Sequence, residues 1–431
     1  MKAARLGSEE VTSPDSISHL SDDLLLRILS LLPVRTAMST SLLSKRWKPV
    51  WKMMPMLVYD ETCPYIGSLG FDLFCGVSLP LHEALKTLNL KLRKYSDSID
   101  TILFPNIGSN LLEMTINLNY YYGYYTPIKF SNNLNVFKTL FVLKLQGKIV
   151  LDVVDSPVCF PSLKILHLTC VDFQCEESFT RFLSACPVLE DFFLQRLCSG
   201  GRFLFTISVP PLHRLSITSE PAYYGSDEPR LEISTPCLNY LKIFDRCGYY
   251  NFLEDMPKLV EADVSVDMSK NENLLRVLSS VEHLVICLYP SMVLDLTDSL
   301  IFNQLLHLEL DVCNSFRSNL LLSFLKYFPN LQSLKLGRTY PEDTEDQLYC
   351  LGSEPSSVPK CLSFHLENIQ WTGYGGTLDE REATAYILKN AHRLMTATIR
   401  LQATCMDNGQ IIMKDVTSMS KASASCQLVI E

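Results

Sequence analysis

Apolar residues recur along most of the chain in a six-residue unit whose first, fourth and sixth positions are leucine or another apolar residue. Clear examples occupy residues 140–145, 163–168 and 305–310. In an extended segment, the alternation at the end of each unit places the apolar side chains on one face of a short strand. The unit begins at Leu85, Leu111, Leu140, Leu163, Leu189, Leu212, Leu238, Leu259, Val281, Leu305 and Leu331.

The spacing of these units averages about 25 residues, within the range of roughly 20–29 residues that leucine-rich repeats occupy. Each strand has an apolar face that only neighbouring repeats can bury, so the pattern predicts a curved solenoid with its strands on the concave side. Amphipathic segments between the strands, such as residues 177–185 and 319–327, are expected to form helices on the convex side. We therefore expect leucine-rich repeats over residues 80–340.

Polar residues stand between the apolar positions of the expected strands and would face the concave surface. Solenoids bind partners through extended concave faces, so these side chains form the expected surface for a target protein, although solvation alone explains any single one. The candidate target-binding residues are Lys144, His167, Asp191, Lys242, Asp263, Glu309 and Lys335, with Ser216 at the matching position of another strand. A tyrosine-rich stretch at residues 120–125 suits either an exposed contact loop or the cover of an irregular repeat.

A different apolar period marks residues 15–60. Ser21 can cap a helix that begins with Asp22 and Asp23, because serine accepts an early amide hydrogen bond and acidic residues suit the positive end of the helix dipole. Apolar residues then recur on one helical face up to Pro33, which ends the helix, and further helices are expected over residues 34–43 and from residue 44 onward. Three helices in about 45 residues make a poor core alone. The module therefore either packs on a partner or caps the next domain.

The repeat period lapses after Leu336. Residues 341–357 are acidic and contain proline and serine, which is typical of a linker or long loop. Residues 358–371 then suggest a strand, the glycines at 373–376 a turn, Asp379 the cap of a helix over 380–391, and residues 394–401 a further strand. A small α/β unit at the end of a solenoid would cover the apolar face of its last repeat.

Two separated motifs near the N-terminus resemble the F-box of plant F-box proteins. The first runs from Ile17 to Pro33 and the second from Ser41 to Trp51. The resemblance implies that residues 15–60 bind the Skp-type adaptor of an SCF (Skp–cullin–F-box) ubiquitin ligase, and through it a cullin. Where this chain has Ser21 the family usually has proline, whose ring would add a fixed φ and some apolar contact. The implied adaptor-binding residues are Leu20, Ser21, Ile28, Leu29, Pro33, Val34 and Trp47.

Residues 358–431 resemble the FBD region found at the end of many plant F-box proteins, a likeness that includes residues 422–429. After a flexible tail at residues 1–14, the whole chain then resembles the plant F-box/FBD/leucine-rich-repeat family. The expected fold class is therefore α/β. An N-terminal three-helix F-box is followed by a leucine-rich-repeat solenoid, or horseshoe, and by a C-terminal α/β FBD-like cap.

Composition limits which partners the protein can bind and in which compartment it is expected. The 431 residues carry a net charge of −9, which argues against broad contact with nucleic acid or with an anionic membrane. The sequence has no run of about 18 apolar residues, and residues 1–14 lack the apolar segment of a secretory signal. We therefore expect the nucleus or the cytoplasm. Fifteen cysteines occur without a Cys-x-x-Cys pair, and most stand in apolar runs, where a reduced cysteine packs as a small apolar residue.

The sequence contains no pattern typical of a catalytic site, a phosphate-binding loop, a metal site or a cofactor site. We therefore expect that the protein is not an enzyme and that it binds neither a metal ion nor a cofactor. The leading interpretation is a substrate receptor that holds a target protein while partner subunits ubiquitinate it. Two alternatives stay open at this point. One is a protein-interaction scaffold with a degenerate F-box, and the other is a receptor that holds a small molecule on the concave face.

Overall fold

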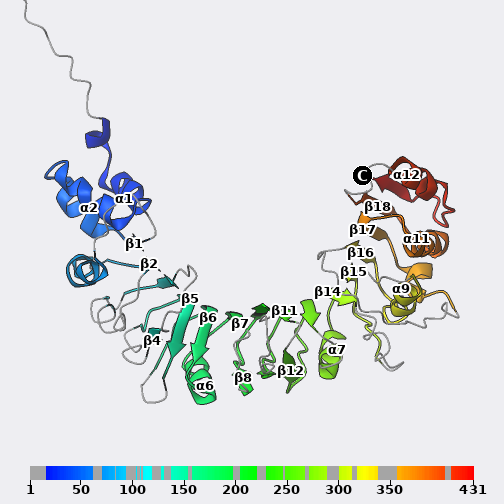
Figure 1. Ribbon diagram of the computed structural model, residues 1–431, viewed down its shortest axis with the longest axis horizontal. Coiled ribbons are helices and arrows are strands. Elements are labelled where there is room, and N and C mark those ends of the chain that lie inside the picture. The colour runs from blue at the N-terminus through cyan, green and yellow to red at the C-terminus, as the bar shows by residue number, and fades with distance from the viewer. Residues whose placement is uncertain are drawn as a thin grey trace, which may run out of the picture.

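The computed structural model describes residues 16–61, 70–82, 84–93, 103, 107, 110–118, 128–130, 137–153, 158–197, 204–220, 230–245, 248–266, 271–288, 300–312, 318–337, 357–402 and 409–431. The expected tail at 1–14, the tyrosine-rich stretch at 120–125 and the expected linker, apart from its last residue, lie outside the described residues. The described chain forms a horseshoe in which the strands line the inner side (Figure 1). This architecture confirms the α/β fold class.

One parallel sheet of 16 strands runs through the whole horseshoe. All eleven units found in the sequence begin two residues before a strand, as Leu85 does before β2 and Leu331 before β16. β4 (Ile128–Phe130) pairs with β5 beside the main path. The path is β1 (Met56–Asp60), β2 (Thr87–Leu92), β3 (Glu113–Leu118), β5 (Val142–Leu151), β6 (Ile165–Phe173), β7 (Asp191–Leu197), β9 (Arg214–Glu220), β11 (Tyr240–Asp245), β13 (Glu261–Val266), β14 (His283–Leu288), β15 (His307–Val312), β16 (Ser333–Gly337), β17 (Asn368–Tyr374), β18 (Thr396–Leu401) and β19 (Gln427–Ile430).

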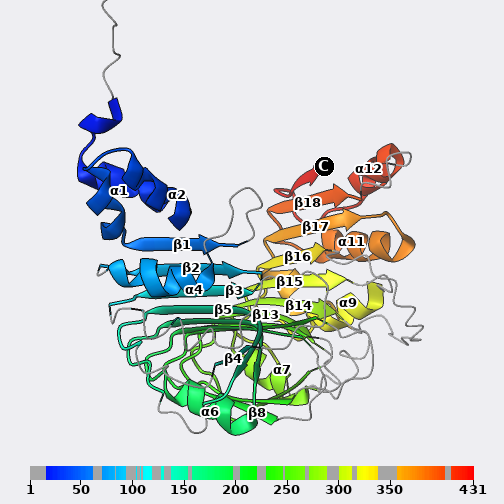
Figure 2. The same cartoon turned by 60° about the vertical axis from the view of Figure 1, so that its left-hand side comes forward.

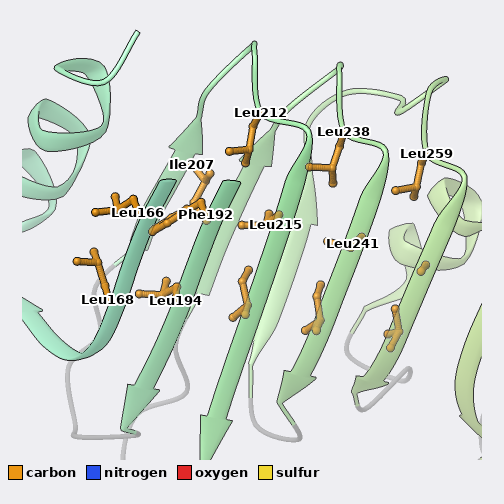
Figure 3. Packing of buried hydrophobic residues seen from close by; sticks show 14 of the residues in the cluster. Leu166, Leu168, Phe192, Leu194, Ile207, Leu212, Leu215, Leu238, Leu241 and Leu259 are labelled. Carbon is orange, nitrogen blue, oxygen red and sulfur yellow. The ribbon is translucent and has the colours of Figure 1, made fainter. Parts of the chain in front are cut away.

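The core lies behind the sheet, where the three apolar positions of each repeat point inward. Leu212, Leu215 and Ile217 of one repeat are almost fully buried. In Figure 3, Leu238 and Leu241 of the next repeat stand beside Leu212 and Leu215, because the parallel register pairs Leu215 with Leu241. Burial of one leucine side chain stabilises a fold by about 1.5–3 kcal/mol. Each repeat therefore gains this stability only when its neighbours are folded.

The outer layer differs from one repeat to another. The expected helices at 177–185 and 319–327 are present as α6 (Glu176–Ser184) and α9 (Ser318–Leu325), and α7 (Glu272–Leu278) is a further one. Between α6 and α7 a second parallel sheet replaces the expected helices, in the order β12 (Tyr249–Phe252), β10 (Arg230–Ser234) and β8 (Leu204–Ser208). Buried and less buried residues alternate along β8 and β10. That two-residue period favours strands over helices.

The N-terminal helices are short. η1 (Ser16–His19) precedes α1 (Asp22–Ser30), and Oγ of Ser21 accepts a 3.4 Å hydrogen bond from the backbone N–H of Leu24, so Ser21 is the cap. Pro33 stands directly before α2 (Val34–Ser39), which continues as the 3-10 turn η2 (Thr40–Leu42). The third helical part consists of α3 (Trp47–Val50) and η3 (Trp51–Met53). β1 follows almost at once, so the F-box runs directly into the sheet.

A helical segment follows β1 on the outer side of the first repeats (Figure 1). It consists of α4 (Phe71–Leu73), the π-helical turn η4 (Phe74–Ser78) and the 3-10 turn η5 (Leu79–Leu81). Its inner face packs into the same core as the F-box helices and the sheet. The F-box and the first repeat therefore share one apolar core.

The C-terminal region continues the main sheet. β17, β18 and β19 add in parallel after β16, with α11 (Leu378–Asn390) and α12 (Gly409–Ser418) on the outer side (Figure 2). Two details of the sequence prediction are wrong. Residues 360–364 form α10 (Lys360–Phe364) instead of a strand, because the buried neighbours Cys361 and Leu362 cannot share one face of a strand. The cap of α11 is Thr377, which exchanges hydrogen bonds with Glu380 in a capping box, and not Asp379.

Candidate protein-interaction surfaces

The N-terminal helices carry several exposed large apolar side chains. α1 leaves Leu24 and Ile28 exposed on one side, and Leu31 and Leu42 are 83 % and 87 % exposed. Leu31 and Leu42 were not singled out from the sequence, because they lie at or beyond helix ends, outside the periodic positions. Large apolar side chains that gather in contact with water mark an interaction site. We call this set the helical apolar surface, and it consists of Ile17, Leu24, Ile28, Leu31, Leu42 and Leu43.

The residues implied to bind an adaptor occupy different environments. Ser21 and Ile28 are exposed, whereas Leu20 and Pro33 are half-buried. The other three pack into the core of this chain, where they hold the F-box helices together. A direct adaptor contact stays a prediction for all seven, and the exposed Ile28 is the position at which a substitution tests it most cleanly. The three buried residues are Leu29, Val34 and Trp47.

An ion pair fixes the start of α1 against the third helical part. The guanidinium of Arg46 contacts Oδ1 of Asp22 at 2.7 Å through Nη2 and at 3.1 Å through Nε. Nη2 of Arg46 also donates a hydrogen bond to the carbonyl oxygen of Leu20. Both charged side chains are well exposed, so the pair contributes at most about 1 kcal/mol. Its main effect is to fix the entry of the chain into α1, beside the helical apolar surface.

The strands present their concave-facing side chains in rows across the horseshoe. Parallel register aligns the third residue of each strand in one row, which we call the central row. Among the candidate target-binding residues, Asp191 alone is outside it, two residues earlier in β7 and 4.0 Å from Arg214. Phe193 takes that place and lies against His167, with ring centroids 5.4 Å apart. The central row includes Lys144, His167, Phe193, Ser216, Lys242, Asp263, Val285, Glu309 and Lys335.

Toward the C-terminal half, charged residues of the central row neutralise one another. Nζ of Lys242 lies 2.5 Å from Oδ2 of Asp263, and Nζ of Lys335 lies 2.7 Å from Oε1 of Glu309. Such partly exposed pairs contribute about 0–1 kcal/mol to stability. A partner that used one of these four charges would have to compete with the existing pair. This half of the row is therefore polar but nearly neutral.

The N-terminal half of the concave face is hollowed over β1 to β6. The hollow has a volume of about 550 Å³. Lys144 stands exposed in its lining. Burial, and then the positive charge of Lys144, lower the pKa of the neighbouring His167, so this imidazole is neutral at pH 7. The concave-facing residues of the hollow are Val58, Asn89, Lys91, Glu113, Thr115, Asn117, Val142, Lys144 and Ile165.

Two of the buried cysteines are poor nucleophiles. Burial raises the pKa of the Cys186 and Cys361 thiols to about 12, so both stay protonated at neutral pH. His283 and His307 stack on neighbouring strands, with ring centroids 4.4 Å apart. Within the described ranges, no group of three or more metal-ligating side chains could hold an ion. The helices described there are all too short or too polar to cross a membrane.

Comparison with known protein families agrees with this layout. The F-box domain family matches residues 17–59, which comprise the N-terminal helices and most of β1. The leucine-rich-repeat family matches residues 162–187, which include β6 and α6. The FBD family matches residues 354–399, from before α10 into β18. All three parts expected from the sequence are therefore present.

Relatives from Arabidopsis thaliana carry the same parts over the whole chain. One, whose name joins F-box, FBD and LRR-repeat, is 63 % identical over 434 residues and aligns over 100 % of both chains. A second, named as an FBD-associated F-box protein, is 49 % identical over 443 residues, which cover 100 % of this chain and 98 % of the relative. A third, an F-box/FBD/LRR-repeat protein, is 34 % identical over 438 residues, which cover 98 % of this chain and 100 % of the relative. F-box proteins with leucine-rich repeats are generally adaptors rather than enzymes. This chain therefore belongs to the F-box/FBD/LRR-repeat family of plant proteins.

Proposed function

We propose that this chain is the substrate-recognition subunit of an SCF-type ubiquitin ligase. Its F-box binds a Skp-type adaptor, which connects it to a cullin, and its leucine-rich repeats bind a target protein for ubiquitination. The observation that carries the proposal is the helical apolar surface, which leaves Leu24, Ile28 and four other large apolar side chains of the F-box in water. A surface of this kind suits a partner that buries it in an apolar groove.

The layout supports simultaneous binding of two partners. The F-box lies at one end of the horseshoe, and the concave face opens between the two ends (Figure 1). An adaptor on the helices and a target on the concave face would therefore use different surfaces. In this arrangement the chain contributes no chemistry of its own. It holds the target near the ligase, so that ubiquitin transfer becomes a reaction between partners already held in place.

Within the concave face, we propose the hollow over β1 to β6 as the first point of target contact. Lys144 is exposed there, next to the neutral imidazole of His167. Lys242 and Lys335 in the same row already hold acidic partners. A target residue can therefore reach the charge of Lys144 without breaking one of those two ion pairs.

Co-purification with a Skp-type adaptor tests the proposal. Ile28→Asp together with Leu24→Asp places two charges on the helical apolar surface and should abolish co-purification, while both side chains are exposed and the fold should persist. Lys144→Glu, in the hollow, should leave adaptor binding unchanged and serves as the matched control. Trp47 is buried, so its substitution would test folding instead. A wild-type chain that binds no Skp-type adaptor from the organism of its relatives would contradict the proposal.

Two other functions are compatible with the same fold. A scaffold with a degenerate F-box would bind a target but no adaptor, so the adaptor experiment separates it from the proposal. A small-molecule receptor would need an apolar pocket ringed by basic groups. The hollow instead presents Asn89, Thr115 and Asn117 alongside both acidic and basic residues. We also propose that the protein acts in the nucleus or the cytoplasm. Only the sequence supports this location.

A further inference from the structure

The exposed apolar surface at the N-terminal end extends beyond the F-box helices. Within the described residues, 24 large apolar side chains are exposed, and ten of them lie between Ile17 and Leu81. Six belong to the helical apolar surface. The remaining fourteen are spread over all the later repeats and the C-terminal region, a much longer stretch of chain. The four additional side chains at the N-terminal end are Met53, Leu73, Val77 and Leu81.

Three of these side chains form a stripe on the helical segment from α4 to η5. Leu73, Val77 and Leu81 recur every four residues and are 52 %, 55 % and 40 % exposed. Gly76 and Pro80 are exposed on the same face of the segment. Asp72 is the charged residue on this face. A solvated helix face normally carries several polar groups, so this composition is unusual for a surface that stays in water. We call Leu73, Val77 and Leu81 the outer stripe. The opposite face is buried and consists of Phe74, Cys75, Ser78 and Leu79.

The segment that carries the outer stripe is packed against the F-box. Oγ of Ser78 donates to Sδ of Met38 in α2 at 3.5 Å. The His82 ring packs edge-on against Trp51 in η3, with centroids 5.2 Å apart. Met38 stands four residues before Leu42, about one helical turn from the helical apolar surface. The outer stripe and the helical apolar surface therefore belong to one packed unit and lie on adjoining elements.

We propose that the Skp-type adaptor covers the outer stripe as well as the F-box helices. The inference rests on the proposed function and adds Leu73, Val77 and Leu81 to its adaptor site. The position of the segment identifies the occupant, since its buried face packs against α2 through Ser78 and Met38, and α2 leads directly into η2, which carries Leu42 of the helical apolar surface. The helical segment that carries the stripe lies on the outer side of the horseshoe, away from the concave face that is proposed for the target (Figure 1). An adaptor that docks on both surfaces holds the first repeat as well as the F-box, which fixes the direction of the horseshoe relative to the ligase.

Calorimetric titration of the full chain with a purified Skp-type adaptor of Arabidopsis thaliana tests the inference. Leu73→Asp combined with Val77→Asp should raise the Kd by about tenfold or more, because two side chains at an apolar interface would become charged. Leu204→Asp is the matched control. Leu204 is 39 % exposed on β8, in the convex sheet between α6 and α7, and its substitution should leave the Kd unchanged. Leu73→Ser combined with Val77→Ser should give a smaller increase, and circular dichroism should show wild-type melting for each variant.

The outcomes separate this inference from the proposed function. If Ile28→Asp abolishes adaptor binding while the outer-stripe variants keep the wild-type Kd, the inference is overturned and the proposed function stands. If the wild-type chain fails to bind the adaptor, both fall. A second copy of the chain is the competing occupant. Light scattering that shows a wild-type dimer, made monomeric by Leu73→Asp and Val77→Asp with an unchanged adaptor Kd, would also overturn the inference.

Discussion

A buried polar network links three elements near the middle of the horseshoe. Asn271 occupies the N-cap position of α7, but its side chain reaches β12 instead of capping the helix. Its Oδ1 accepts a hydrogen bond from the backbone N–H of Tyr250 at 2.7 Å, and its Nδ2 donates to the carbonyl oxygen of Gly248 at 3.2 Å. Asp245, at the end of β11, accepts from the hydroxyl of Tyr250 at 2.5 Å and from the N–H of Gly248 at 3.2 Å. The network therefore ties β11, β12 and α7 together.

Replacement of Asn271 by alanine tests how much this network contributes. The side chain is almost fully buried, so water cannot readily replace its two hydrogen bonds to Tyr250 and Gly248. A buried polar group that loses its partner costs about 1–3 kcal/mol. Two such groups predict a loss of about 2–6 kcal/mol in the free energy of unfolding. Asn251 is exposed on β12, so Asn251→Ala is the matched control and should change stability by less than about 0.5 kcal/mol.

Urea titration followed by far-ultraviolet circular dichroism measures both free energies. Hydrogen exchange then locates the loss. In Asn271→Ala the amide of Tyr250 should exchange faster, together with β10 and α7, because each repeat depends on its neighbours. The F-box helices should keep their wild-type exchange. If Asn271→Ala unfolded at the same urea concentration as Asn251→Ala, the network would not support this part of the solenoid.

Three other changes test the two ends of the molecule. Burial lowers the pKa of His82 from 6.5 to about 4. The unfolded chain therefore binds this proton more tightly, and stability should fall as the pH drops from 6.5 to 4, by about 2 kcal/mol at pH 5 relative to pH 7. Thermal melts should show this loss in the wild type and not in His82→Phe, and equal losses would contradict the assignment. Ser21 has a φ of −65°, which proline adopts without strain. Ser21→Pro should therefore change stability by no more than about 1 kcal/mol and tighten adaptor binding in a calorimetric titration, and weaker binding would count against the proposed interface. Removal of residues 357–431 would uncover the edge of β16, so the shortened chain should aggregate or lose its cooperative transition. A monomeric shortened chain with a wild-type melt would instead show that the FBD part is an independent unit.

The solenoid could be predicted from sequence because every repeat buries apolar residues at the same three positions of its unit. Leu85 and Leu331 lie at opposite ends of the repeat array, yet each stands two residues before a strand. The same spacing continues at Leu366 before β17 and at Leu394 before β18. From sequence alone these two positions fall in a separate unit, because the interval from Leu331 to Leu366 is longer than a normal repeat. The sequence predicts the apolar period within each unit. It does not predict that the sheet continues from β16 to β17 across that interval.

Features that depend on contacts between distant residues could not be read in the same way. The pairing of Lys242 with Asp263 appears only once β11 and β13 are neighbours. Phe193 is the fifth position of its unit, as Lys144 and His167 are of theirs, but a choice by polarity favours Asp191 over it. Sequence reasoning therefore found most of the concave row but missed that part of it is already neutralised. For the F-box, the helical period does not predict which leucines are exposed. Leu29 is buried, whereas Leu31 and Leu42, at or beyond helix ends, are exposed.

The central proposal is that the F-box helices bind the adaptor while the concave strands remain free for a target. Hydrogen exchange of the full chain, measured with and without a purified Skp-type adaptor, tests it most directly. We expect slower exchange in α1 and η2 when the adaptor is added, and unchanged exchange from β5 to β16. Protection confined to the concave strands, or no protection in the F-box helices, would contradict the proposed function.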